Sequence, residues 1–214
     1  MLEALNFGVP LDRARVVCVL VHGRNQTPEE MVETVVGHLT APGVAYVLPR
    51  AKSKSWYDAR AVDPLTDQTR AQVAQSLAEL GQVMAQAQKS GLPVLLAGFS
   101  QGACLALEHA LASGPWPGAL VAFTGCRVGA VGDERPNMPV NGLPVYLTGG
   151  DADPWIPVTG FAEAAAALGL AHARLRADLF PGRGHEVCPQ ELRVLDGVLR
   201  DLAQGKPVTW ESSR

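Results

Sequence analysis

Residues 95–105 read LLAGFSQGACL and place a serine, Ser100, between an apolar run and a segment rich in alanine and leucine. The apolar run has the length of a buried strand, and residues 103–112, ACLALEHALA, are typical of a helix. Gly98 and Gly102 let the backbone pass close to the tight turn between them, because glycine lacks a Cβ atom. The pattern Gly-Xaa-Ser-Xaa-Gly between a strand and a helix indicates a nucleophile elbow, which projects a serine hydroxyl above the sheet.

Strands and helices alternate along the rest of the chain. This order predicts right-handed βαβ units and an α/β fold with a mainly parallel, doubly wound sheet that helices cover on both faces. The 214 residues contain no repeat or linker, so we expect a single domain over 1–214, with 203–214 loosely attached apart from Trp210. The predicted strands are 15–21, 44–49, 94–99, 118–125, 145–149 and 173–181, and the predicted helices are 28–39, 73–87, one directly after Ser100, 160–170 and 190–202.

Composition excludes several classes of protein. The formal charge of −3 comes without a lysine or arginine run, which argues against nucleic-acid binding. No apolar run is long enough to span a membrane, and the first ten residues do not resemble a signal peptide, so we expect a cytoplasmic protein without membrane insertion. The four cysteines show neither a CxxC pair nor histidines at ligand spacing. They therefore indicate reduced thiols rather than a metal site or disulfides.

The candidate nucleophile Ser100 needs a base within hydrogen-bond reach and an acid that orients the base. In folds with a nucleophile elbow, the three residues occur in the chain order serine, acid, histidine. Only His172 and His185 lie far enough after Ser100 to be the base. His172 lies between a predicted helix and strand, a position that is more often structural. His185 lies in the glycine-rich loop PGRGHEV after the last predicted strand. Loops at the carboxyl ends of parallel strands carry the chemistry of such folds, so His185 is the preferred base.

The acid is expected in GGDADPW, directly after the strand at 145–149. Both Asp151 and Asp153 are candidates. Asp153 is preferred because Pro154 fixes the direction of the chain there, and Asp151 stays open as the alternative.

The developing negative charge of a tetrahedral intermediate needs preorganised N–H donors. One is expected from the residue after the nucleophile, Gln101, and the other from a loop after an early strand. VHGRN is such a loop, and its Gly23 allows a sharp turn, so the main-chain N–H of Arg24 is the expected second donor. We expect His22 to brace this loop through hydrogen bonds.

The segments VHGRNQTPEEM, LPRAKSKSWYD, LLAGFSQGACLALEHA, GDADPWIP and GRGHEV follow one another over residues 16–202. With them the chain resembles the phospholipase/carboxylesterase family, which includes acyl-protein thioesterases and small bacterial esterases. The resemblance implies an α/β-hydrolase fold without a large cap domain. It also implies hydrolysis of carboxylic esters or thioesters with no metal and no cofactor. By position, the resemblance assigns the triad to Ser100, Asp153 and His185, the oxyanion donors to Arg24 and Gln101, and the lining of the acyl side to Trp56.

The sequence thus predicts a serine carboxylesterase that cleaves small to medium acyl esters through an acyl-enzyme, with Trp56 and Trp155 as candidate substrate-binding residues. A lysophospholipase or acyl-protein thioesterase is the alternative, but it needs a longer apolar channel than segment 49–66 obviously offers. A non-catalytic binding protein on a hydrolase scaffold is disfavoured because all three candidate triad residues are present. The natural ester, the acyl length and the oligomeric state stay open, with a homodimer as one option.

Overall fold

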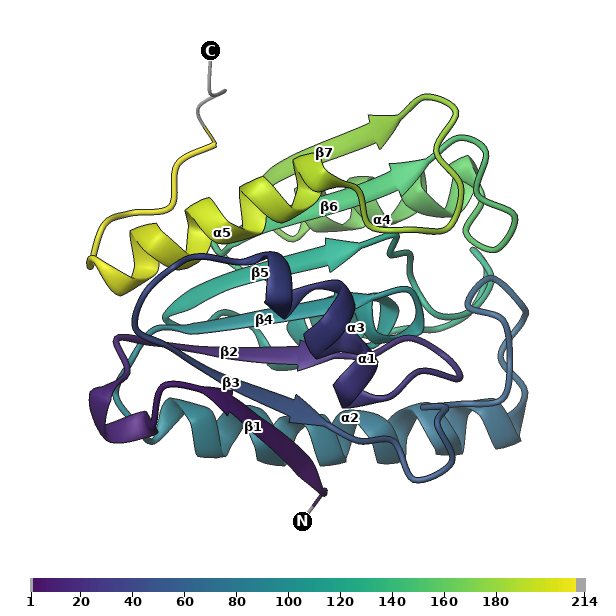
Figure 1. The fold of residues 1–214 in the computed structure, drawn as a ribbon. Coiled ribbons are helices and arrows are strands. Elements are labelled where there is room, and N and C mark those ends of the chain that lie inside the picture. Colours follow the sequence, from purple (N-terminus) through teal and green to yellow (C-terminus); the bar gives the residue numbers. More distant parts are fainter. Residues whose placement is uncertain (1, 211–214) are drawn as a thin grey trace.

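The computed structural model describes residues 2–210 and shows a seven-stranded sheet between two layers of helices (Figure 1). Two short 3₁₀ helices, η1 and η2, accompany the longer elements. The strands are β1 (Ala4–Gly8), β2 (Val16–Val21), β3 (Val44–Pro49), β4 (Val94–Phe99), β5 (Gly118–Phe123), β6 (Pro144–Gly150) and β7 (Arg174–Phe180). The helices are η1 (Leu11–Arg13), α1 (Pro28–Thr34), η2 (Val36–His38), α2 (Asp67–Gln88), α3 (Gln101–Ser113), α4 (Val158–Leu170) and α5 (Pro189–Ala203).

The strands lie in the order β1-β3-β2-β4-β5-β6-β7, and every pair except β1 with β3 is parallel. The predicted mainly parallel sheet is confirmed. Strand β1 was not predicted from the sequence. It is a five-residue edge strand whose side chains are half-buried or exposed, so it has no apolar run to reveal it. It runs antiparallel to β3, with Ala4 opposite Pro49.

Helices α1 and α5 cover one face of the sheet, and α2, α3 and α4 cover the other (Figure 1). Met31 of α1 and Leu195 and Leu199 of α5 belong to the first core, together with one set of strand side chains. Leu80 of α2 and Leu107 of α3 belong to the second core. Strands β2 and β4 are buried on both faces, which explains why they read as continuous apolar runs.

Several predicted segments have different bounds in the structure. The helix predicted over 73–87 begins at Asp67, and the strand predicted over 118–125 ends at Phe123. The helix expected over 28–39 stops at Thr34, because Val35 leaves the helical conformation, and continues as a short 3₁₀ helix. More of the C-terminal tail packs against the domain than was expected, since the prediction included only Trp210. Val208 is buried, and the Trp210 indole donates a 2.7 Å hydrogen bond to the Arg174 carbonyl. Residues 211–214, the rest of the predicted loose tail, lie outside the described part of the chain.

Candidate active site

Ser100 occupies a strained turn between β4 and α3. Its backbone has φ 54° and ψ −122°, a conformation that non-glycine residues rarely adopt and that is concentrated at functional sites. Its main-chain N–H donates to the Phe123 carbonyl at 2.9 Å, which ties the turn to the end of β5. The hydroxyl is thereby held at the carboxyl end of the central strands.

The two glycines that flank Ser100 are required by close backbone contacts. A Cβ atom on Gly102 would lie 2.2 Å from the carbonyl oxygen of Val21, and one on Gly98 would lie 2.5 Å from the backbone of Gly102. Neither contact is sterically allowed. The first turn of α3 therefore packs directly onto the ends of β2 and β4, and this packing makes the tight corner at Ser100 possible.

His185 lies in the loop between β7 and α5, and it contacts Ser100 at the carboxyl ends of the strands. Its Nε2 atom is 2.8 Å from the Ser100 Oγ atom, and its Nδ1 atom is 2.8 Å from Oδ2 of Asp153. The Phe99 ring packs against the imidazole, with 5.1 Å between ring centroids. The three side chains expected from the sequence thus form one hydrogen-bonded chain.

The two candidate acids have different environments. The Asp153 side chain is fully buried, and its Oδ1 atom accepts hydrogen bonds from the main-chain N–H groups of Trp155 at 2.8 Å and Ile156 at 3.0 Å. Asp151 is exposed and accepts a 2.5 Å bond from the Gly182 N–H instead. The structure therefore brings Asp153, and not Asp151, to the imidazole.

A buried ion pair supports the His185 loop, and the sequence reasoning missed it. Arg183 is 5% exposed and donates from Nη1 to both carboxylate oxygens of Glu191, which is itself fully buried, and to the Glu186 carbonyl. Glu191 also accepts a 2.6 Å bond from the Cys188 N–H and so closes the first turn of α5. Breaking a buried pair of this kind is costly because one charge is left without a partner. The signal in the sequence that could have indicated this pair was the presence of a basic residue, Arg183, before His185 and an acidic residue, Glu191, after it.

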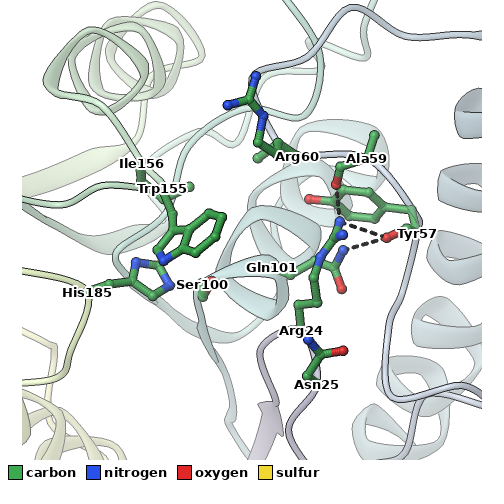
Figure 2. A pocket seen from close by; sticks show the side chains of 11 residues that line it. Arg24, Asn25, Tyr57, Ala59, Arg60, Ser100, Gln101, Trp155, Ile156 and His185 are labelled. Atoms are coloured by element: carbon green, nitrogen blue, oxygen red, sulfur yellow. Dashed lines mark hydrogen bonds between the residues drawn. The ribbon is translucent and has the colours of Figure 1, made fainter.

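A pocket of about 270 Å³ opens in front of Ser100. One wall comes from the turn after β6, and the opposite wall comes from the loop between β3 and α2 (Figure 2). The side chains that line it are Arg24, Asn25, Tyr57, Ala59, Arg60, Ala61, Ser100, Gln101, Trp155, Ile156 and His185.

The aromatic residues of the pocket differ in part from those expected. Trp155 is 58% exposed and lines the pocket beside His185 (Figure 2). The expectation for Trp56 is corrected, because this residue does not line the pocket and donates from its indole to the His22 carbonyl at 2.8 Å. Its neighbour Tyr57 lines the pocket instead. Adjacent residues in a loop point in different directions, and only tertiary contacts decide which one faces the cavity.

The side chains of Gln101 and Arg24 hold the loop that forms the second wall. The Gln101 amide accepts from the Trp56 N–H at 2.9 Å and donates to the Tyr57 carbonyl at 2.7 Å. The Arg24 guanidinium donates from Nη2 to the carbonyls of Tyr57, at 3.1 Å, and Ala59. Neither main-chain N–H, of Arg24 or of Gln101, has a hydrogen-bond acceptor among residues 2–210.

His22 also holds the loop of Arg24 and the pocket wall together through hydrogen bonds to main-chain groups. It donates from Nδ1 to the Gly23 carbonyl at 2.7 Å, and its Nε2 atom accepts from the Ala51 N–H at 3.1 Å. Burial lowers the pKa of His22 below its usual value, which favours the neutral ring that this pattern of donor and acceptor requires. His22 therefore links the loop that carries Arg24 to the start of the pocket wall.

Two kinds of feature are absent from residues 2–210, the part of the chain that the structure describes. This part of the chain holds no group of three histidine, cysteine or carboxylate side chains arranged around a common metal position. Within the same residues, no helix has both the length and the apolar character needed to cross a bilayer.

A doubly wound sheet, a serine on a strained strand-to-helix turn and the chain order Ser100, Asp153, His185 define an α/β-hydrolase fold. The family model for phospholipases and carboxylesterases matches residues 8–202, and the chain belongs to this family. Its members are hydrolases of the phospholipase/carboxylesterase type.

Solved structures agree with this assignment. A phospholipase/carboxylesterase from Dyadobacter fermentans is 29% identical, with a TM-score of 0.83 over 93% of this chain and 96% of the other. Esterase PE8 is 25% identical, with a TM-score of 0.75 over 94% and 99% of the two chains. A carboxylesterase from Bacillus cereus shares the fold at 17% identity, with a TM-score of 0.69 over 94% and 95% of the chains.

Proposed function

We propose that this protein is a serine carboxylesterase that hydrolyses small to medium acyl esters. The observation that carries the proposal is the hydrogen-bonded chain from Ser100 through His185 to Asp153, with the serine open to a pocket. A serine hydroxyl becomes nucleophilic when a neutral imidazole can accept its proton, and a buried carboxylate on the other ring nitrogen selects the required tautomer.

In the proposed reaction, the Ser100 oxygen attacks the ester carbonyl while Nε2 of His185 takes the hydroxyl proton. The tetrahedral intermediate collapses to an acyl-enzyme, and the same proton passes to the departing alcohol. Water then attacks the acyl-enzyme with His185 as base, and the acid product leaves as Ser100 regains its proton. Asp153 stays ionised throughout and stabilises the imidazolium.

The main-chain N–H groups of Gln101 and Arg24 are the proposed donors to the negative oxygen. Their position beside Ser100 and their lack of an acceptor within residues 2–210 support this role. Such donors are effective because they are already oriented when the charge develops. Gln101 thus has two proposed roles. Its side chain holds the pocket wall through hydrogen bonds to Trp56 and Tyr57, and its main-chain N–H donates to the negative oxygen.

The size of the pocket supports a substrate with a short acyl chain. Its volume of about 270 Å³ is below the usual range of roughly 300 to 1,000 Å³ for ligand pockets. Trp155 at the mouth is the proposed contact for the substrate, because its ring is exposed and borders the pocket.

Two measurements test the proposal. An active-serine phosphonate probe should label the protein and fail to label Ser100→Ala, whereas a binding protein on the same scaffold would not be labelled. A series of 4-nitrophenyl esters from acetate to palmitate, beside a long-chain thioester, should show the highest kcat/KM for the short and medium esters. A maximum at palmitate or with the thioester would contradict the proposed acyl range.

A further inference from the structure

The charged groups that line the active-site pocket are of one sign. The guanidinium groups of Arg24 and Arg60 line it, and no carboxylate of the described residues does. Figure 2 shows the Arg24 guanidinium beside the carbonyls of Tyr57 and Ala59, across the pocket from Trp155 and His185, whereas the Arg60 side chain extends away at the top of the view. A pocket lined by one sign of charge attracts substrates of the opposite sign.

The two guanidinium groups differ in how far their charge is balanced. Arg60 forms a 2.8 Å salt bridge with Asp63 and is 64% exposed, so it adds little net charge to the pocket. Among residues 2–210, no carboxylate lies within 4.0 Å of the Arg24 guanidinium. Its hydrogen bonds go to two neutral carbonyl groups. The Asp63 carboxylate, whose pKa is lowered mainly by its hydrogen bond from Arg60, is also within the electrostatic reach of Arg24. Arg24 itself forms no ion pair among residues 2–210.

The position of Arg24 is fixed although it forms no ion pair within residues 2–210. The carbonyls of Tyr57 and Ala59 both accept from Nη2, which orients the planar group against the pocket wall. A guanidinium has five N–H donors, so those on Nη1 and Nε stay available. A cation that is already oriented binds a carboxylate with less loss of conformational freedom than a freely moving side chain does.

We propose that the preferred ester carries a carboxylate, which binds to the free N–H groups of Arg24 while the ester carbonyl reacts at Ser100. This inference rests on the proposed esterase function and adds a substrate class to it. It separates two roles of one residue, because the Arg24 main chain faces the negative oxygen of the intermediate and its side chain binds a second, permanent negative charge.

The experiment compares esters of equal shape and different charge. On the acyl side the pair is mono-4-nitrophenyl adipate and 4-nitrophenyl 6-methylheptanoate, in which an isopropyl group replaces the carboxylate. On the alcohol side it is 4-carboxyphenyl butyrate and 4-carbamoylphenyl butyrate. Rates without enzyme are subtracted. We expect kcat/KM to favour the anionic member of at least one pair by about 2- to 5-fold at low salt, the effect of an ion pair at a solvent-exposed rim.

The variant Arg24→Met tests the residue, and Arg13→Met is its matched control. Arg13 is exposed in η1, ahead of β2 and so at the opposite end of the sheet, and its loss changes the net charge by the same amount. The anionic preference should fall to about one in Arg24→Met and persist in Arg13→Met. In the unmodified protein it should also shrink as salt is raised to 1 M, because salt screens an exposed ion pair.

Arg24→Met also loosens the pocket wall, so the ratio within each pair is the informative quantity. Equal losses on the anionic and the neutral ester would mean that Arg24 only braces the wall, and this would overturn the inference. A salt-independent ratio near one for both pairs in the unmodified protein would do the same. In either case turnover of the neutral ester would leave the proposed esterase intact, whereas no turnover of any ester would refute the esterase itself.

Discussion

Replacement of Asp153 by asparagine tests the proposed triad most directly, because the structure predicts how the new amide will orient. The Oδ1 atom of Asp153 accepts two main-chain N–H groups, from Trp155 and Ile156, and Oδ2 faces Nδ1 of His185. An asparagine must keep its oxygen toward the two N–H donors and turn its NH₂ group toward the imidazole. The amide then donates to Nδ1, which forces the ring proton onto Nε2. In that tautomer His185 cannot accept the proton of Ser100.

The expected loss follows from this change of tautomer. The corresponding substitution in a serine protease lowers kcat by about 10⁴, and we expect a similar factor here, equivalent to about 5.4 kcal/mol of activation free energy. The fold should persist, because the two main-chain hydrogen bonds are kept. Initial rates on 4-nitrophenyl butyrate, with a thermal melt of each variant, measure both effects.

Asp151→Asn is the matched control for this prediction. The Asp151 carboxylate is exposed and accepts only from the Gly182 N–H among the hydrogen bonds of residues 2–210, a bond that an asparagine oxygen can keep. We expect its kcat to change by less than about 3-fold. A larger loss in Asp151→Asn than in Asp153→Asn would refute the assignment of the acid and the tautomer argument with it.

Ser100→Ala and His185→Ala should each lower kcat by about 10⁴ to 10⁶, and the double variant should be scarcely worse because the residues act as a unit; additive losses in steady-state assays would contradict the triad. Gly102→Ala should destabilise the protein by more than about 2 kcal/mol, because the new Cβ atom would lie 2.2 Å from a backbone oxygen of β2. Its control, Gly197→Ala, meets no atom within 4 Å inside α5 and should stabilise by up to about 1 kcal/mol in urea unfolding. Burial lowers the pKa of His109 from 6.5 to about 4. The unfolded chain therefore binds more protons between these values, and the free energy of unfolding should fall by up to about 3 kcal/mol as pH drops through this window. His109→Gln should lose less over the same window, and parallel pH profiles of the two proteins would rule out this histidine as a cause.

The sequence by itself was enough to predict the alternation of strands and helices, the parallel sheet and the elbow at Ser100. These features depend on local pattern, since a strand buried on both faces must be apolar throughout and a tight corner must have glycines beside it. The order of residues along the chain left His172 and His185 as candidate bases, and the position of His185 in a loop after the last predicted strand decided between them. Strand β1 could not be predicted in this way, because an exposed edge strand needs neither a continuous apolar run nor flanking glycines.

Tertiary structure alone decided where side chains in the loops point. Asp151 and Asp153 are two residues apart, but only Asp153 is oriented by the N–H groups of the following turn toward His185. Trp56 and Tyr57 are adjacent, and the bond from the Trp56 indole to a distant carbonyl turns it away from the pocket. The same holds for the side chain of Arg24, whose carbonyl partners are more than thirty residues away along the chain. Such contacts join segments that are distant in sequence, so no local pattern records them.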